Sequence, residues 1–70
     1  MPKPYPLRKV MKVLTKKGFF FVSQKGSHAK YRKKGNPTIT VIVPQHGKTI
    51  PYGTFRSILR QANLTEEDFR

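Results

Sequence analysis

Two histidines are the side chains of this 70-residue sequence that are best suited to acid–base chemistry. His28 follows Gly26 and Ser27, a tight-turn pair, and stands among several lysines and arginines. A neutral imidazole beside a phosphate can take a proton from a ribose 2′-hydroxyl, and an imidazolium can return one to a leaving group. His28 is therefore the candidate general acid or base. The alternative is a surface histidine at a strand edge that only contacts phosphate or water.

The second histidine, His46, lies in a segment punctuated by Pro44 and Gly47, directly after a predicted strand. Loops of this kind often carry functional side chains. With His28 it would form an acid–base pair, and Lys48 would stabilise charge on the phosphate. The alternative is a histidine with a structural role in its loop.

The charge of the chain indicates an anionic partner. Lysine and arginine total 15 against 3 acids, so the formal net charge is +12, and residues 1–65 contain no acid at all. Such a chain presents a basic face that suits nucleic acid, an anionic membrane or an acidic protein. Backbone N–H groups in a turn can also hold a phosphate. The residues predicted to bind substrate phosphate are Lys25, Gly26, Ser27, Lys30, Arg32 and Lys48.

The residues that are missing narrow the chemistry further. The chain has no cysteine, which excludes a disulfide scaffold, a zinc ribbon and a thiol nucleophile. Two histidines without a nearby carboxylate do not make a metal-ligand set, and Ser27 lacks the acid of a catalytic triad, so we predict neither metal nor cofactor. The longest unbroken apolar run, Phe19–Val22, is too short for a membrane span or a signal peptide. We therefore expect a cytoplasmic protein with no membrane partner.

Apolar residues at i, i+3, i+4 and i+7 predict two helices that would support these residues. The first begins at residue 7 and stops at Gly18, and the second covers about 51–62 and ends at Asn63. The apolar positions are Leu7, Val10, Met11 and Leu14 in the first helix, and Phe55, Ile58, Leu59 and Ala62 in the second. The basic positions, which are further candidates for phosphate contact, are Lys9, Lys12 and Lys16 in the first helix and Arg56 and Arg60 in the second.

Strands are predicted at 19–24, 28–33 and 38–43, where aromatic and β-branched residues gather between turn signals. Three prolines predict that residues 1–6 form an extended arm, because proline does not fit a helix interior. Residues 45–50 are predicted to form a loop. Thr65 and Asp68 are a capping signal for a last helical turn. The order α-β-β-β-α predicts one domain over residues 1–70.

The turn at Gly26 and Ser27 predicts the register of the first hairpin, because glycine in the first loop position favours a type II′ turn. The expected pairs on the solvent face are Lys25 with His28, Ser23 with Lys30, and Phe21 with Arg32. The expected residues of the core face are Phe20, Val22, Ala29 and Tyr31. A one-residue bulge would invert part of this pattern.

Several motifs, in their order and spacing over about residues 7–69, resemble the HicA (YcfA-like) toxins of bacterial and archaeal toxin–antitoxin systems. These motifs are Gly18-Phe19, Lys25-Gly26-Ser27-His28 with Tyr31, Val43-Pro44-Gln45-His46, Gly53-Thr54 and Arg56–Ala62. The resemblance implies an α+β, double-stranded-RNA-binding-like fold with a three-stranded antiparallel sheet and two helices on one face. The family's catalytic histidine falls on His28, and its Pro-x-His falls on His46. The chain departs from the family at Ala62-Asn63, where relatives usually have Ala-Gly.

The resemblance also implies the activity and the partners. Family members are ribosome-independent endoribonucleases that cleave mRNA, and an acidic HicB antitoxin covers their active site. We therefore expect a toxin that cuts single-stranded mRNA without a metal. One alternative is a non-catalytic RNA-binding module of the same fold. Another alternative is a DNA-binding or ribosome-associated basic protein, which only the charge of the chain supports.

Overall fold

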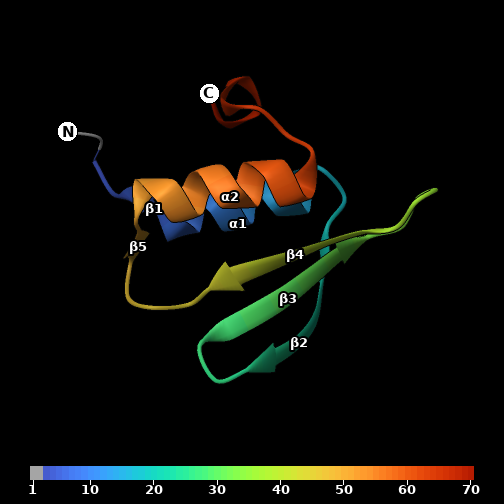
Figure 1. Ribbon diagram of the computed structural model, residues 1–70, viewed down its shortest axis with the longest axis horizontal. Coiled ribbons are helices and arrows are strands. Elements are labelled where there is room, and N and C mark those ends of the chain that lie inside the picture. The colour runs from blue at the N-terminus through green and yellow to red at the C-terminus, as the bar shows by residue number, and fades with distance from the viewer. Residues whose placement is uncertain (1–2) are drawn as a thin grey trace.

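The computed structural model describes residues 3–70 and shows two helices on the same side of a three-stranded antiparallel sheet of order β2-β3-β4 (Figure 1). The strands of this sheet are β2 (Phe20–Lys25), β3 (His28–Lys33) and β4 (Ile39–Pro44), and the helices are α1 (Leu7–Lys16) and α2 (Tyr52–Ala62). The predicted α+β class and the order α-β-β-β-α are confirmed. None of the helices within residues 3–70 combines the length and the apolar character that a membrane crossing requires.

Helix α1 begins directly after Pro6 and ends before Gly18, as predicted, and Gly18 has the positive φ of 98° that favours glycine after a helix. Its buried side chains include Val13, which the apolar spacing did not select, whereas the predicted core residue Met11 is only half-buried. The cause is the C-terminal turn, which packs on one flank of α1 and covers Val13 there.

A second, two-stranded sheet corrects the expectation for the arm and the loop. Strand β1 (Tyr5–Pro6) pairs antiparallel with β5 (Thr49–Ile50), so the arm is anchored at its end and the unpaired loop stops at Lys48. The ring of Tyr5 stacks on Phe55 with centroids 3.9 Å apart, and Ile50 is buried in the hydrophobic core. These contacts join residues far apart in sequence, so no local pattern predicts them.

The hairpin of β2 and β3 has the predicted register near its turn and a different one beyond it. Lys25 lies opposite His28 and Ser23 opposite Lys30, but a bulge between Phe21 and Ser23 shifts the rest. Phe21 therefore lies opposite Tyr31 and packs against its ring with centroids 5.7 Å apart. The predicted pairing of Phe21 with Arg32 is wrong.

The core face of the sheet is also narrower than predicted. Ala29 is buried and Tyr31 is half-buried, where burial raises the pKa of the phenol. Phe20 and Val22, which were expected in the core, are 42% and 36% exposed. The helices cover β3 and β4, whereas β2 is the free edge of the sheet and every one of its residues is exposed.

Strand β4 forms the covered edge of the sheet. Val41 and Val43 are fully buried under the helices, whereas Ile42 points to the opposite face. The side-chain oxygen of Gln61 on α2 accepts the Ile42 backbone N–H at 3.0 Å. Helix α2 thus supplies a partner to an edge N–H that would otherwise face solvent or another chain.

The chain closes with the short 3-10 helix η1 (Glu66–Phe69), after α2 has ended at Asn63 in the left-handed conformation, as predicted. The capping signal of Thr65 and Asp68 is confirmed, since an Asp68 oxygen accepts the Thr65 N–H at 2.8 Å. The other oxygen lies 3.1 Å from Lys17 Nζ. The Thr65 backbone bond and the Lys17 ammonium together hold the pKa of Asp68 below its ordinary value.

Replacing Asp68 with Asn should loosen the C-terminal turn at neutral pH. Because the folded state lowers the pKa of Asp68 from 3.8, its stabilising effect is fully present above that value and is lost as the pH falls through the lowered pKa. We expect the urea midpoint of Asp68→Asn to lie below that of the parent at about pH 7, and the difference to shrink as the pH falls through the lowered pKa of Asp68.

Glu67→Gln is the matched control for this measurement. Within residues 3–70, Glu67 pairs only with Arg70 at 3.1 Å, and both side chains are about three-quarters exposed, so its removal should leave the midpoint unchanged. Equal midpoints for Asp68→Asn and the parent at neutral pH would show that the carboxylate does not hold the turn.

Candidate functional site

The face of the sheet that points away from the helices carries the predicted site in three rows across the strands. The register places Lys25, His28 and Pro44 in the row nearest the hairpin turn, Ser23, Lys30 and Ile42 in the next, and Phe20, Arg32 and Thr40 in the last. Neighbours within a row are in contact distance, and rows are about 7 Å apart. Positive charge and one imidazole therefore share this face.

The two histidines meet at the end of the first row. Their ring centroids lie 6.0 Å apart and their planes are nearly perpendicular at 89°. Ser27 Oγ and His46 Nε2 are 3.0 Å apart, within hydrogen-bond distance, so the turn residue before His28 holds the ring of His46. Both imidazoles are exposed to solvent. The pair that sequence analysis proposed from two distant segments is thus assembled by the fold.

Backbone contacts fix the loop that carries His46. The Gln45 N–H donates to the Ser27 carbonyl, which joins the loop to the hairpin turn. The Leu7 N–H donates to the Lys48 carbonyl at 3.0 Å, which joins the other end of the loop to the start of α1. Gly47, between them, has a φ of 65°, which favours glycine. The position of His46 therefore depends on both the sheet and α1.

The predicted phosphate-binding residues differ in their distance from the histidines. Lys25 lies directly opposite His28, and Lys30 is one row further. Arg32 is four residues along β3 from His28, or about 13 Å, and its Nε donates to Thr40 Oγ1 at 3.4 Å. Lys25 is therefore the cation nearest to His28 on the sheet, whereas Arg32 belongs to the far end of the basic face.

No carboxylate competes for the cations of this face within the described residues 3–70. The ion pairs found there join Lys17 with Asp68, Arg56 with Glu66, and Arg70 with Glu67, all at the C-terminal end of the fold. The predicted site residues Lys25, Lys30, Arg32 and Lys48 take part in none of them. These four side chains are available to an external anion.

Among residues 3–70, His, Cys, Asp and Glu do not come together in any group of three or more that could hold a metal ion. The expectation of metal-free chemistry stays a prediction, and the reaction itself must test it.

Two imidazoles at this spacing can act as acid and base on the same phosphodiester. One ring can accept a proton from an attacking hydroxyl while the other donates a proton to the leaving oxygen, because those two oxygens flank the same phosphorus atom. A cation beside them, such as Lys25, stabilises the extra negative charge of the transition state. The geometry thus suits acid–base cleavage of a phosphodiester more directly than simple binding.

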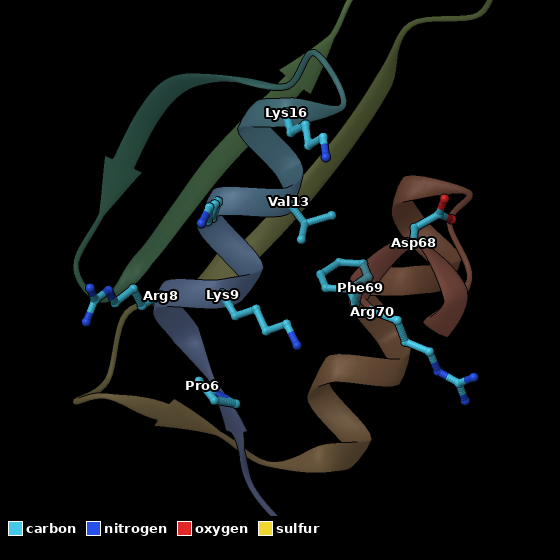
Figure 2. Close-up of a pocket in the computed structure, with 9 residues that line it drawn as sticks. Pro6, Arg8, Lys9, Val13, Lys16, Asp68, Phe69 and Arg70 are labelled. Atoms are coloured by element: carbon cyan, nitrogen blue, oxygen red, sulfur yellow. The ribbon is translucent and has the colours of Figure 1, made fainter.

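The helical lysines form a separate groove between α1 and the C-terminal turn (Figure 2). This groove has a volume of about 510 Å³, and Figure 2 shows Lys9 and Lys16 beside it with Val13 and Phe69 between α1 and η1. The three lysines of the predicted stripe line this groove, together with Asp68 and Arg70. These lysines are Lys9, Lys12 and Lys16.

The arginines of α2 have a different environment. Arg56 Nη1 lies 3.8 Å from Glu66, and Arg60 Nη2 donates to Ser57 Oγ at 3.2 Å. Because the acids of η1 lie beside them, this face of α2 is the least suited of the basic surfaces to bind a phosphate.

Sequence analysis missed a groove beside the His46 loop. It has a volume of about 640 Å³, and its walls include Arg8, Met11, Gln45 and Lys48. Met11 was assigned to the core because of its helical spacing, and Gln45 was not assigned a role. The position of Gln45 next to His46, in a loop between proline and glycine, is the signal that could have drawn attention to it.

Comparison with known protein families agrees with the motifs. The family model described as the HicA toxin of bacterial toxin-antitoxin matches residues 7–64, which include both helices, the whole three-stranded sheet and the His46 loop. No curated protein matches the chain.

Proposed function

Because the chain belongs to the HicA toxin family, we propose that it is the toxin of a type II toxin–antitoxin system and a metal-independent endoribonuclease that cleaves mRNA in the cytoplasm. The observation that carries this proposal is the juxtaposition of His28 with His46, at 6.0 Å, on a basic face that lacks carboxylates. His28 is proposed as the general acid or base, and His46 as the second member of the pair.

In the proposed reaction, the His28 imidazole takes the proton of a ribose 2′-hydroxyl, and the 2′-oxygen forms a bond to the adjacent phosphorus. The bond from phosphorus to the 5′-oxygen breaks, and the imidazolium of His46 protonates that oxygen. The products are a 2′,3′-cyclic phosphate and a free 5′-hydroxyl. Lys25 and the backbone N–H groups of Gly26 and Ser27 are proposed to hold the non-bridging phosphate oxygens.

The contact between Ser27 and His46 supports these roles. A hydroxyl 3.0 Å from Nε2 orients the His46 ring without neutralising it, as a carboxylate would. The two rings lie 6.0 Å apart, so both imidazoles can reach one substrate group. A non-catalytic RNA-binding module would need the basic face but not this orientation, which is why the arrangement favours an enzyme.

The same face is the proposed site of an acidic HicB-like antitoxin. The basic residues of β3 have no acidic partners within the described chain, so an acidic protein can pair with them as readily as RNA can. Exposed Phe20 and Ile42, in the rows beside Arg32 and Lys30, offer the apolar contacts that tight binding requires. Occupation of this face would block access to His28.

Replacing His28 with Ala should abolish RNA cleavage and leave the fold intact. His28 is exposed, so the expected change in the free energy of unfolding is within about 0.5 kcal/mol. Cleavage of a defined mRNA by the purified variant and its thermal unfolding are the measurements. Ser23→Ala, in the next row of the same face, is the control and should keep the parental rate. A His28→Ala protein that cleaves RNA at the parental rate would show that His28 is not the catalyst.

The chemistry predicts two further results with the parental protein. Cleavage should continue in excess EDTA, because protons and cations of the chain carry the proposed reaction. It should stop when the ribose on the 5′ side of the cut is replaced by deoxyribose, which removes the attacking hydroxyl. An RNA with deoxyribose one nucleotide further away is the matched control. A requirement for added Mg²⁺, or cleavage of the deoxy substrate, would contradict the mechanism.

Charge reversal on β3 should weaken the binding of both RNA and the antitoxin. Lys30→Glu or Arg32→Glu is expected to reduce RNA affinity and to slow antitoxin association most at low salt, because complementary charge acts mainly on the association rate. Surface plasmon resonance at several salt concentrations measures both. Lys34→Glu makes the same charge change in the turn after β3 and serves as the control. Unchanged antitoxin binding by both β3 variants would place the antitoxin elsewhere.

A further inference from the structure

The groove beside the His46 loop combines apolar and basic walls. Its volume of about 640 Å³ lies within the range of about 300–1,000 Å³ that is typical of small-molecule sites. Leu7 and Met11 contribute apolar surface, and Arg8 and Lys48 contribute positive charge. No acid lines it. A ligand that combines an apolar body with anionic groups matches these walls.

Gln45 gives this groove its polar recognition group. Its backbone N–H is held by the Ser27 carbonyl, so its position is fixed to the turn that carries His28. Its side-chain Nε2 lies 3.7 Å from Met11 Sδ, and sulfur is a weak acceptor. The Gln45 side chain is half-buried, and this weak contact leaves most of the hydrogen-bonding groups of its amide free. It can exchange the contact for a donor–acceptor pair on a ligand.

Met11 completes the recognition surface. Its thioether is polarizable and packs well against aromatic rings. The side chain is half-buried at the margin of the core, so one side of it is supported and the other faces the groove. A planar ring that lies on Met11 would present its edge to the amide of Gln45.

We propose that this groove binds one nucleobase of the RNA next to the scissile phosphate, and that Gln45 and Met11 set the base preference of cleavage. Gln45 reads the hydrogen-bonding edge of the base, Met11 contacts its face, and Arg8 and Lys48 hold the flanking phosphates. The position follows from the chain, because Gln45 directly precedes His46 and is bonded to the residue before His28. This inference rests on the proposed function and assigns the residues that determine which base is recognised at the cleavage site.

The first test compares cleavage patterns. Random-sequence RNA is digested with the parent, Gln45→Ala, Met11→Ala and the matched control Gln24→Ala, and the new ends are sequenced. We expect the parent to prefer one base at one position beside the cut. Gln45→Ala should reduce that preference by roughly 5- to 100-fold, the range for loss of a specific base contact, and keep cleavage of other sites. Gln24→Ala, on β2 outside the groove, should keep the parental preference.

The second test measures binding without cleavage. The His28→Ala protein is titrated with four short oligoribonucleotides that differ in one base, and the methyl signal of Met11 is followed by NMR. We expect one base to bind most tightly and to shift this signal, and Gln45→Ala in the same background should make the four affinities equal. Equal affinities of the His28→Ala protein for the four oligoribonucleotides, or no shift of the Met11 signal, would overturn the inference. A shift caused by an acidic peptide and not by RNA would also overturn it.

The two tests separate this inference from the proposed function. Cleavage that depends on His28 but has no base preference sensitive to Gln45 or Met11 would reject the base site and leave the nuclease in place. Base-specific binding in the groove by a protein whose parent does not cleave RNA would reject the nuclease and keep the groove as a reader of RNA sequence.

Discussion

The alternation of side chains along β3 is the constraint on which the site depends. Ala29 must face the helices because Val41 and Val43 on the neighbouring strand build the core there. The period of two residues then places His28 and Lys30 on the opposite face. A shift of the strand by one residue would bury a cation and expose the core. The hydrophobic effect thus holds the charged face in place, although none of its side chains contributes to the core.

The His46 loop shows how the second half of the site is coupled to the rest of the fold. It is bonded to the hairpin turn through Ser27 and to the start of α1 through Leu7, and the same loop leads into the small β1–β5 sheet. Packing of Tyr5 on Phe55 holds that sheet against α2. The relative position of the two histidines is therefore supported by packing well away from them. Substitutions in the small sheet should therefore displace His46 more than they displace His28.

The distribution of charge divides the molecule into two parts. The acids are gathered on η1, where they pair with Lys17, Arg56 and Arg70 and close the fold at its C-terminal end. The remaining cations repel one another, which lowers the stability of the free protein at low salt. An anion that binds the folded state relieves this repulsion and stabilises it. RNA and an acidic antitoxin are thus expected to share one property, stabilisation of the toxin, as well as one surface.

The local sequence determined both helices, their ends at Gly18 and Asn63, the strands of the main sheet and the turn at Gly26, because spacing and turn chemistry act over a few residues. It also determined the His28 face, through the register at the turn. Only the tertiary structure decided the bulge before Ser23, the β1–β5 pair, the burial of Val13 in place of Met11, and the groove at Gln45. The β1–β5 pair, the burial of Val13 and the groove depend on contacts between segments distant in sequence, and the bulge depends on the pairing of β2 with β3. No local pattern contains the free energy of these contacts.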